Sequence, residues 1–100
     1  MPGHPVAELA ALDALFAARR IFVDDHRAGA EFAFIARRCA RRFYRPAYIA
    51  AINVLERSGG RTAVETVVIY GRMPRVPSEL DRLQDGLDAL ATHFRAEGLL

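Results

Sequence analysis

A repeat of large apolar residues near the C-terminal end most constrains the fold of this 100-residue chain. The repeat advances by alternating steps of three and four positions, which places its members on one narrow side of an α-helix. Ser78 and Asp81 resemble a capping box for this helix, and Gly98 is suited to its end. Gly86 lies off the stripe and should cost the helix about 1 kcal/mol relative to Ala. The members of the stripe are Leu80, Leu83, Leu87, Leu90 and Phe94.

The centre of the chain has the pattern of a β-hairpin. Residues 48–55 are largely apolar, and residues 62–70 are rich in β-branched side chains, which favour strands. Between them lies Ser58-Gly59-Gly60, a turn signal because glycine reaches positive φ without a Cβ clash. A further strand is expected at 20–23, and either aspartate of Asp24-Asp25 can cap the helix that follows it.

Two more helices are expected, one on each side of the strand at 20–23. The first begins near Pro5, which suits a first helical position, and ends at Phe16. The second runs from about His26 to Phe43, and Pro46 ends it because the residue before a proline is pushed out of the α region. The apolar stripe of this second helix consists of Ala28, Phe32, Ile35, Cys39 and Phe43.

The order of elements after the first helix is therefore β-α-β-β-α. The simplest packing is an α+β fold of half-ferredoxin type, a small sheet containing antiparallel strands with both helices on one face. An apolar content of 52% suffices for one core. We expect a single α+β domain over residues 1–100, with 1–19 as an N-terminal helical extension. The open sheet face and the narrow leucine stripe also predict a homodimer.

Arginines are clustered near the end of the second expected helix. Five of the 14 basic residues lie in positions 37–45, and every basic residue of the chain is arginine. Guanidinium groups present paired donors that suit phosphates and carboxylates. Phe34 lies in the same helical arc, where an aromatic ring can stack on a base or on an arginine of a partner. The predicted partner-binding residues are Arg27, Phe34, Arg37, Arg38, Arg41, Arg42 and Arg45.

The same cluster has a structural interpretation. Clustered charge often only keeps a face solvated, and Phe34 would then pack under the N-terminal helix. The uneven distribution of charge along the chain suits oriented contact with a partner or self-association. Residues 19–45 hold eight Arg against three acidic residues, whereas residues 77–100 hold two Arg against five acidic residues.

The order of elements resembles that of the RraB-type regulators, small bacterial proteins that inhibit ribonuclease E. The matching parts are Ile21-Phe22-Val23, the helix from His26, the hairpin around Gly59-Gly60 and the helix from Leu80 to Phe94. The resemblance implies a protein that binds an enzyme and has no chemistry of its own. The chain departs from the family in its arginine-rich helix, since familiar members are strongly acidic, and in having no Trp.

No group of residues is typical of a catalytic or metal site. Cys39 lies on an apolar stripe, where a thiol behaves as a small apolar group, and the three histidines are scattered. Residues 24–26 are adjacent and cannot easily converge on one ion. We therefore predict no catalytic residue, no metal and no cofactor. The apolar runs are too short for a membrane span and no secretory signal is evident, so we expect a cytoplasmic protein without a membrane partner.

These features together predict a non-catalytic protein that binds a macromolecular partner. The expected function is to regulate or inhibit a protein partner, such as a nuclease, another nucleic-acid-processing enzyme or a nucleoprotein complex. One alternative is a direct RNA- or DNA-binding module that uses the arginine-rich face. The other is a structural subunit of a homodimer.

Overall fold

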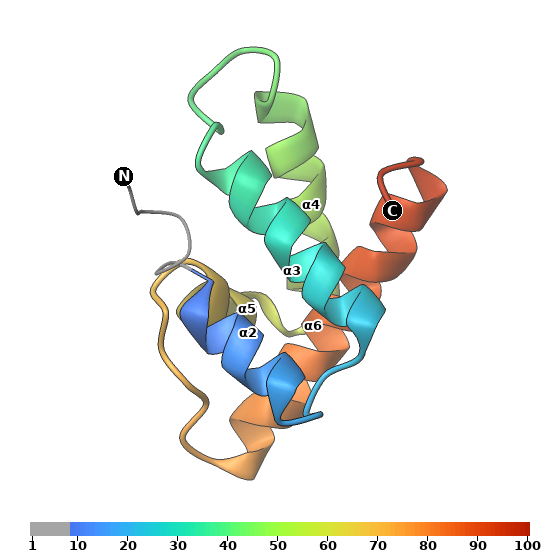
Figure 1. Ribbon diagram of the computed structural model, residues 1–100. Coiled ribbons are helices and arrows are strands. Elements are labelled where there is room, and N and C mark those ends of the chain that lie inside the picture. Colours follow the sequence, from blue (N-terminus) through green and yellow to red (C-terminus); the bar gives the residue numbers. More distant parts are fainter. Residues whose placement is uncertain (1–8) are drawn as a thin grey trace.

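The computed structural model describes residues 9–100, and every regular element in this range is a helix. The elements are α2 (Ala10–Ala17), α3 (Val23–Ala36), α4 (Arg45–Ser58), α5 (Arg61–Val68) and α6 (Pro77–Ala96). α3 and α4 run antiparallel as a hairpin, and the long α6 crosses the molecule and contacts α3, α4 and α5 (Figure 1). α2 packs on α3 and α5. Pro5, the expected start of the first helix, lies outside the described residues.

The predicted α+β fold is wrong, because residues 9–100 contain no strand and hence no half-ferredoxin sheet. The segment 48–55 lies inside α4, and the segment 62–70 supplies most of α5. Residues 20–22 form an irregular bend that leads into α3, and Val23 is already the first residue of that helix.

Burial along α4 and α5 follows the helical period. In α4, Ala51 and Leu55 are fully buried and lie four positions apart. In α5, the buried residues are Val64, Val67 and Val68, at spacings of three and four. Such spacing lines one side of a helix, not one face of a strand. The β-branched content of α5 did not decide its conformation because β-propensity depends strongly on what the segment packs against.

The segment Ser58-Gly59-Gly60 joins two helices and is not a hairpin turn. Gly59 has φ 77° and ends α4 in the left-handed conformation. The Ser58 hydroxyl donates to the carbonyl oxygen of Leu55 at 2.8 Å and accepts from the backbone N–H of Gly60 at 3.1 Å. The prediction of positive φ was therefore correct, but a left-handed glycine ends helices as readily as it connects strands.

α3 begins and ends earlier than predicted. Its first residue is Val23, and Asp25 acts from the first turn, where its carboxylate accepts the backbone N–H of Phe22 at 3.3 Å. The helix ends at Ala36 and does not continue to Phe43. Pro46, expected to end this helix, lies in the first turn of α4, where its missing N–H leaves no helical hydrogen bond unmade.

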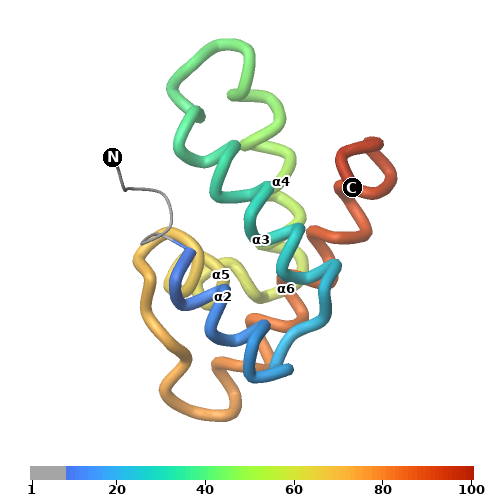
Figure 2. The backbone as a smooth tube through the Cα atoms, in the orientation of Figure 1, coloured from blue at the N-terminus to red at the C-terminus, as the bar shows by residue number. Residues whose placement is uncertain are grey.

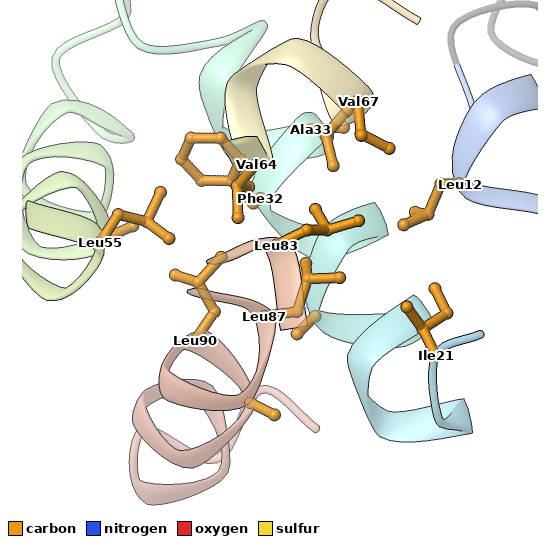
Figure 3. Close-up of a cluster of buried hydrophobic side chains, with 14 of the residues drawn as sticks. Leu12, Ile21, Phe32, Ala33, Leu55, Val64, Val67, Leu83, Leu87 and Leu90 are labelled. Atoms are coloured by element: carbon orange, nitrogen blue, oxygen red, sulfur yellow. The ribbon is translucent and has the colours of Figure 1, made fainter. Parts of the chain in front are cut away.

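The predicted leucine stripe of α6 is confirmed as the centre of the core. Leu83, Leu87 and Leu90 are fully buried and face Phe32 of α3 and Leu55 of α4 (Figure 3). Because the stripe is buried within one chain and no sheet is present in the described residues, neither feature that motivated a homodimer is available as an interface.

The expected ends of α6 are only partly correct. The helix begins with Pro77 after Val76 as N-cap, so Ser78 does not cap it. Glu79 instead accepts the backbone N–H of Arg75 at 3.1 Å. At the other end Gly98 has φ 77°, as expected of a residue that stops a helix.

Candidate functional site

The clustered arginines lie at the free end of the α3–α4 hairpin. Residues 37–44 connect the two helices as a series of turns, at the point of the hairpin farthest from α2 and α5 (Figure 2). We call residues 37–45 the arginine tip. No Asp or Glu occurs between Glu31 and Glu56, whereas five Arg do, so the positive charge of the tip is not neutralised by its own chain segment. A concentrated positive field of this kind attracts polyanions.

Hydrogen bonds between backbone groups order the arginine tip. The N–H of Arg41 donates to the carbonyl oxygen of Arg38 at 2.9 Å, and the N–H of Tyr44 donates to that of Arg41 at 3.0 Å. The Arg45 guanidinium donates to the carbonyl oxygen of Ala40 at 3.2 Å. The tip therefore presents its side chains from a folded loop.

Arg38 stabilises the base of the tip. Its guanidinium carbon lies 3.7 Å from the centroid of the Phe34 ring, and its Nη1 donates to the Phe34 carbonyl oxygen at 3.0 Å. The Tyr44 ring meets Phe34 edge-on with centroids 5.7 Å apart. Phe34 was expected to meet a partner, or to pack under the N-terminal helix. Its ring is 38% exposed and already stacked with Arg38 of its own chain.

Phe43 is the exposed aromatic residue of the tip. Its side chain is 84% exposed, and its ring touches Tyr44 edge-on with centroids 5.1 Å apart. The prediction that Phe43 lies on a buried stripe is wrong, because α3 ends at Ala36 and the helical period no longer holds beyond it. Cys39, expected on the same stripe, is half-buried.

The predicted arginines fall into two places. Arg37, Arg41, Arg42 and Arg45 are exposed in the arginine tip. The guanidinium groups of Arg41 and Arg42 have no ion pair or hydrogen bond to any residue in 9–100. Arg27 is separate from the tip: it lies near the start of α3, about 15 Å from Arg37 along the helix axis. Its guanidinium is 4.0 Å from the Asp24 carboxylate.

A buried carboxyl group lies at the opposite end of α3. Asp25 is 2% exposed, and burial raises the pKa of its carboxyl to about 7, with a further contribution from a hydrogen bond to Asp88 of α6. The neighbouring Asp24 accepts from Arg95 at 2.8 Å. The Asp25–Asp88 pair was not predicted from the sequence, because the two residues lie far apart in the chain and no local pattern links them.

This carboxyl pair joins α3 to α6 and is not accompanied by a metal-binding arrangement. In the described part of the chain, no three His, Cys, Asp or Glu side chains are grouped to hold an ion.

Within residues 9–100, no helix has both the length and the apolar character needed to cross a membrane.

Comparisons with known proteins do not assign this chain to a family. No family model matches it, and neither curated proteins nor solved structures show significant similarity. The β-α-β-β-α order on which the resemblance to RraB-type regulators depended is absent from residues 9–100.

Proposed function

We propose that this protein is a small helical module that binds single-stranded nucleic acid through the arginine tip and performs no chemistry on it. The observation that carries the proposal is the placement of Phe43, 84% exposed, among exposed arginines at the end of a hairpin. An exposed aromatic ring within a positive surface is the combination that single-stranded nucleic acids require.

The arginines and the Phe43 ring of the tip have different physical roles in binding. Arg41, Arg42 and Arg45 are exposed and can neutralise backbone phosphates, releasing the counterions bound to them. The Phe43 ring can stack on one base, an interaction worth about 1–3 kcal/mol and tolerant of sequence. The proposal therefore predicts salt-sensitive binding with little base preference at the tip. It also favours the cytoplasm, where single strands are available and the lone Cys39 stays reduced.

Titration of fluorescent single-stranded RNA and DNA against the protein tests this proposal, with anisotropy measured over a series of salt concentrations. We expect binding at low salt, with a log–log slope near −2, because each neutralised phosphate contributes about −0.7 on single strands. Arg41→Glu combined with Arg42→Glu should abolish the binding. The matched control is Arg57→Glu with Arg72→Glu, which changes net charge equally on exposed residues outside the tip.

Two results would overturn the proposal. One is the absence of binding to either nucleic acid at low salt. The other is equal loss of affinity in the tip variant and the control, which would indicate a general effect of net charge. If nucleic acid does not bind but a nuclease-treated lysate yields a protein that requires Arg41 and Arg42, the tip recognises an acidic protein surface, such as that of a nucleic-acid-processing enzyme.

A further inference from the structure

An open groove lies on α4 directly beside the arginine tip. Arg42 and Arg45 stand at its tip end, and the side chains of Ile49 and Asn53 lie farther along the helix. Pro46 and Ala50 complete the lining, which is mostly apolar. The groove is therefore cationic at one end and apolar along its length.

The lining residues occupy the outer side of α4. Ala51 and Leu55, on the inner side, are fully buried, whereas Ile49 is 51% exposed and Asn53 is exposed. The Asn53 amide makes no hydrogen bond to any residue in 9–100. An exposed isoleucine beside an unpaired amide offers both an apolar surface and donor and acceptor groups to a ligand.

We propose that this groove continues the nucleic-acid site, so that a single strand runs from Phe43 along α4 toward Asn53. This inference rests on the proposed function of the arginine tip. Charge complementarity favours a nucleic-acid strand as the ligand of the groove, because residues 32–55 carry five Arg and no acidic residue. Phosphates would lie at Arg42 and Arg45, and bases would lie over Ile49. The Asn53 amide can pair with a base edge that presents a donor beside an acceptor, as adenine does.

The length of the groove sets the size of the site. From Arg45 to Asn53 the helix axis advances about 12 Å. Stacked nucleotides advance about 3.4 Å each along a strand, so this length holds about three to four of them. With the base on Phe43, the complete site spans about four to five nucleotides, within the range of small single-strand binding modules.

A length series of oligonucleotides combined with groove variants tests the inference. Affinity for oligoadenylates should rise from two to about five nucleotides and then level off. Ile49→Ala should weaken binding of the five-nucleotide ligand about threefold, because apolar contact with a base is lost, and leave the two-nucleotide ligand unaffected. Asn53→Ala should reduce the preference for adenylate over uridylate. Val23→Ala, at an apolar residue 56% exposed on α3, is the matched control.

The outcomes separate this inference from the function on which it rests. If no oligonucleotide binds, the proposed function fails and the groove inference fails with it. If oligonucleotides bind through the tip, but Ile49→Ala and Asn53→Ala match the control at every length, the groove inference is overturned and the tip function stands. A concentration-dependent dimer that Ile49→Ala abolishes would instead assign the groove to a second copy of the chain, and would also overturn the inference.

Discussion

Gly60, at the start of α5, and Gly86, in the middle of α6, bring the backbones of the two helices into direct contact. A Cβ atom at Gly60 would lie 2.8 Å from the Cα of Gly86 and 2.5 Å from the carbonyl oxygen of Arg82. A Cβ atom at Gly86 would lie 2.7 Å from Cγ2 of Val64. The glycine that costs α6 helical propensity therefore permits α5 to pack closely against it.

Alanine at either position should destabilise the protein. Gly60→Ala forces the backbone of α6 to shift, and we expect a loss of about 1–3 kcal/mol in the free energy of unfolding, as for overpacked cores. Gly86→Ala should cost less, because its closest contact is with a side-chain atom of Val64 and not with backbone, and because the helix gains about 1 kcal/mol of propensity. Urea denaturation measures both, with the exposed Thr92→Ala of α6 as control. Equal stability of Gly60→Ala and wild type would contradict the contact.

The buried Asp25 should make stability fall with rising pH. Its folded-state pKa, about 7, lies above the ordinary value of 3.8, so folding favours the protonated carboxyl. This contribution is fully present below pH 3.8 and is lost as the pH rises through about 7. Asp25→Asn keeps the group neutral at every pH, with an acceptor for the Phe22 N–H and a donor for Asp88. Relative to wild type, the variant should gain roughly 1–3 kcal/mol between about pH 5 and pH 8.5.

Urea unfolding at these two pH values checks the Asp25 prediction. Asp85→Asn, on the exposed side of α6, removes one carboxylate without burial and is the control. Its stability difference from wild type should be nearly the same at both pH values. If the stability difference between Asp25→Asn and wild type is also the same at both pH values, the buried carboxyl does not titrate in this range.

Arg38 and Arg42 should differ in what they support. Arg38 stacks on Phe34 and hydrogen-bonds to its carbonyl oxygen, so Arg38→Ala should lose about 1 kcal/mol, or roughly 4–8 °C in Tm. Arg42 has no such contact in residues 9–100, so Arg42→Ala should leave Tm nearly unchanged and weaken nucleic-acid binding. Thermal denaturation and anisotropy on the same variants separate the two roles. A larger loss of Tm for Arg42→Ala than for Arg38→Ala would reverse the assignment.

Phe34 and Phe43 form a similar contrast. Phe43→Ala should preserve Tm, because the ring is 84% exposed, and should weaken single-strand binding by about tenfold or more through lost stacking. Phe34→Ala removes the ring that Arg38 and Tyr44 pack against, so it should lower Tm. Phe43→Leu, which keeps apolar bulk without an aromatic face, should bind as weakly as Phe43→Ala. Full affinity in Phe43→Leu would show that stacking is not the interaction.

Local sequence determined some of the breaks between elements and one complete helix, but not the type of the other elements. Gly59 and Gly98 take positive φ, as expected of the breaks they mark. The stripe from Leu80 to Phe94 predicted both a helix and its buried side, because 15 residues at helical spacing leave no other conformation that buries them together. The clustering of arginine in one segment, and hence a positively charged surface, was also visible in the chain itself.

Only the tertiary structure decided that 48–55 and 62–68 are helical, because short apolar runs suit a buried strand or a buried helix equally and the contacts with α6 select between them. The same packing decided the candidate site. Once α3 ends at Ala36, Phe43 leaves the core and becomes the exposed ring of the arginine tip. The Asp25–Asp88 pair and the Gly60–Gly86 contact likewise join residues far apart in the chain, and no local pattern encodes such contacts.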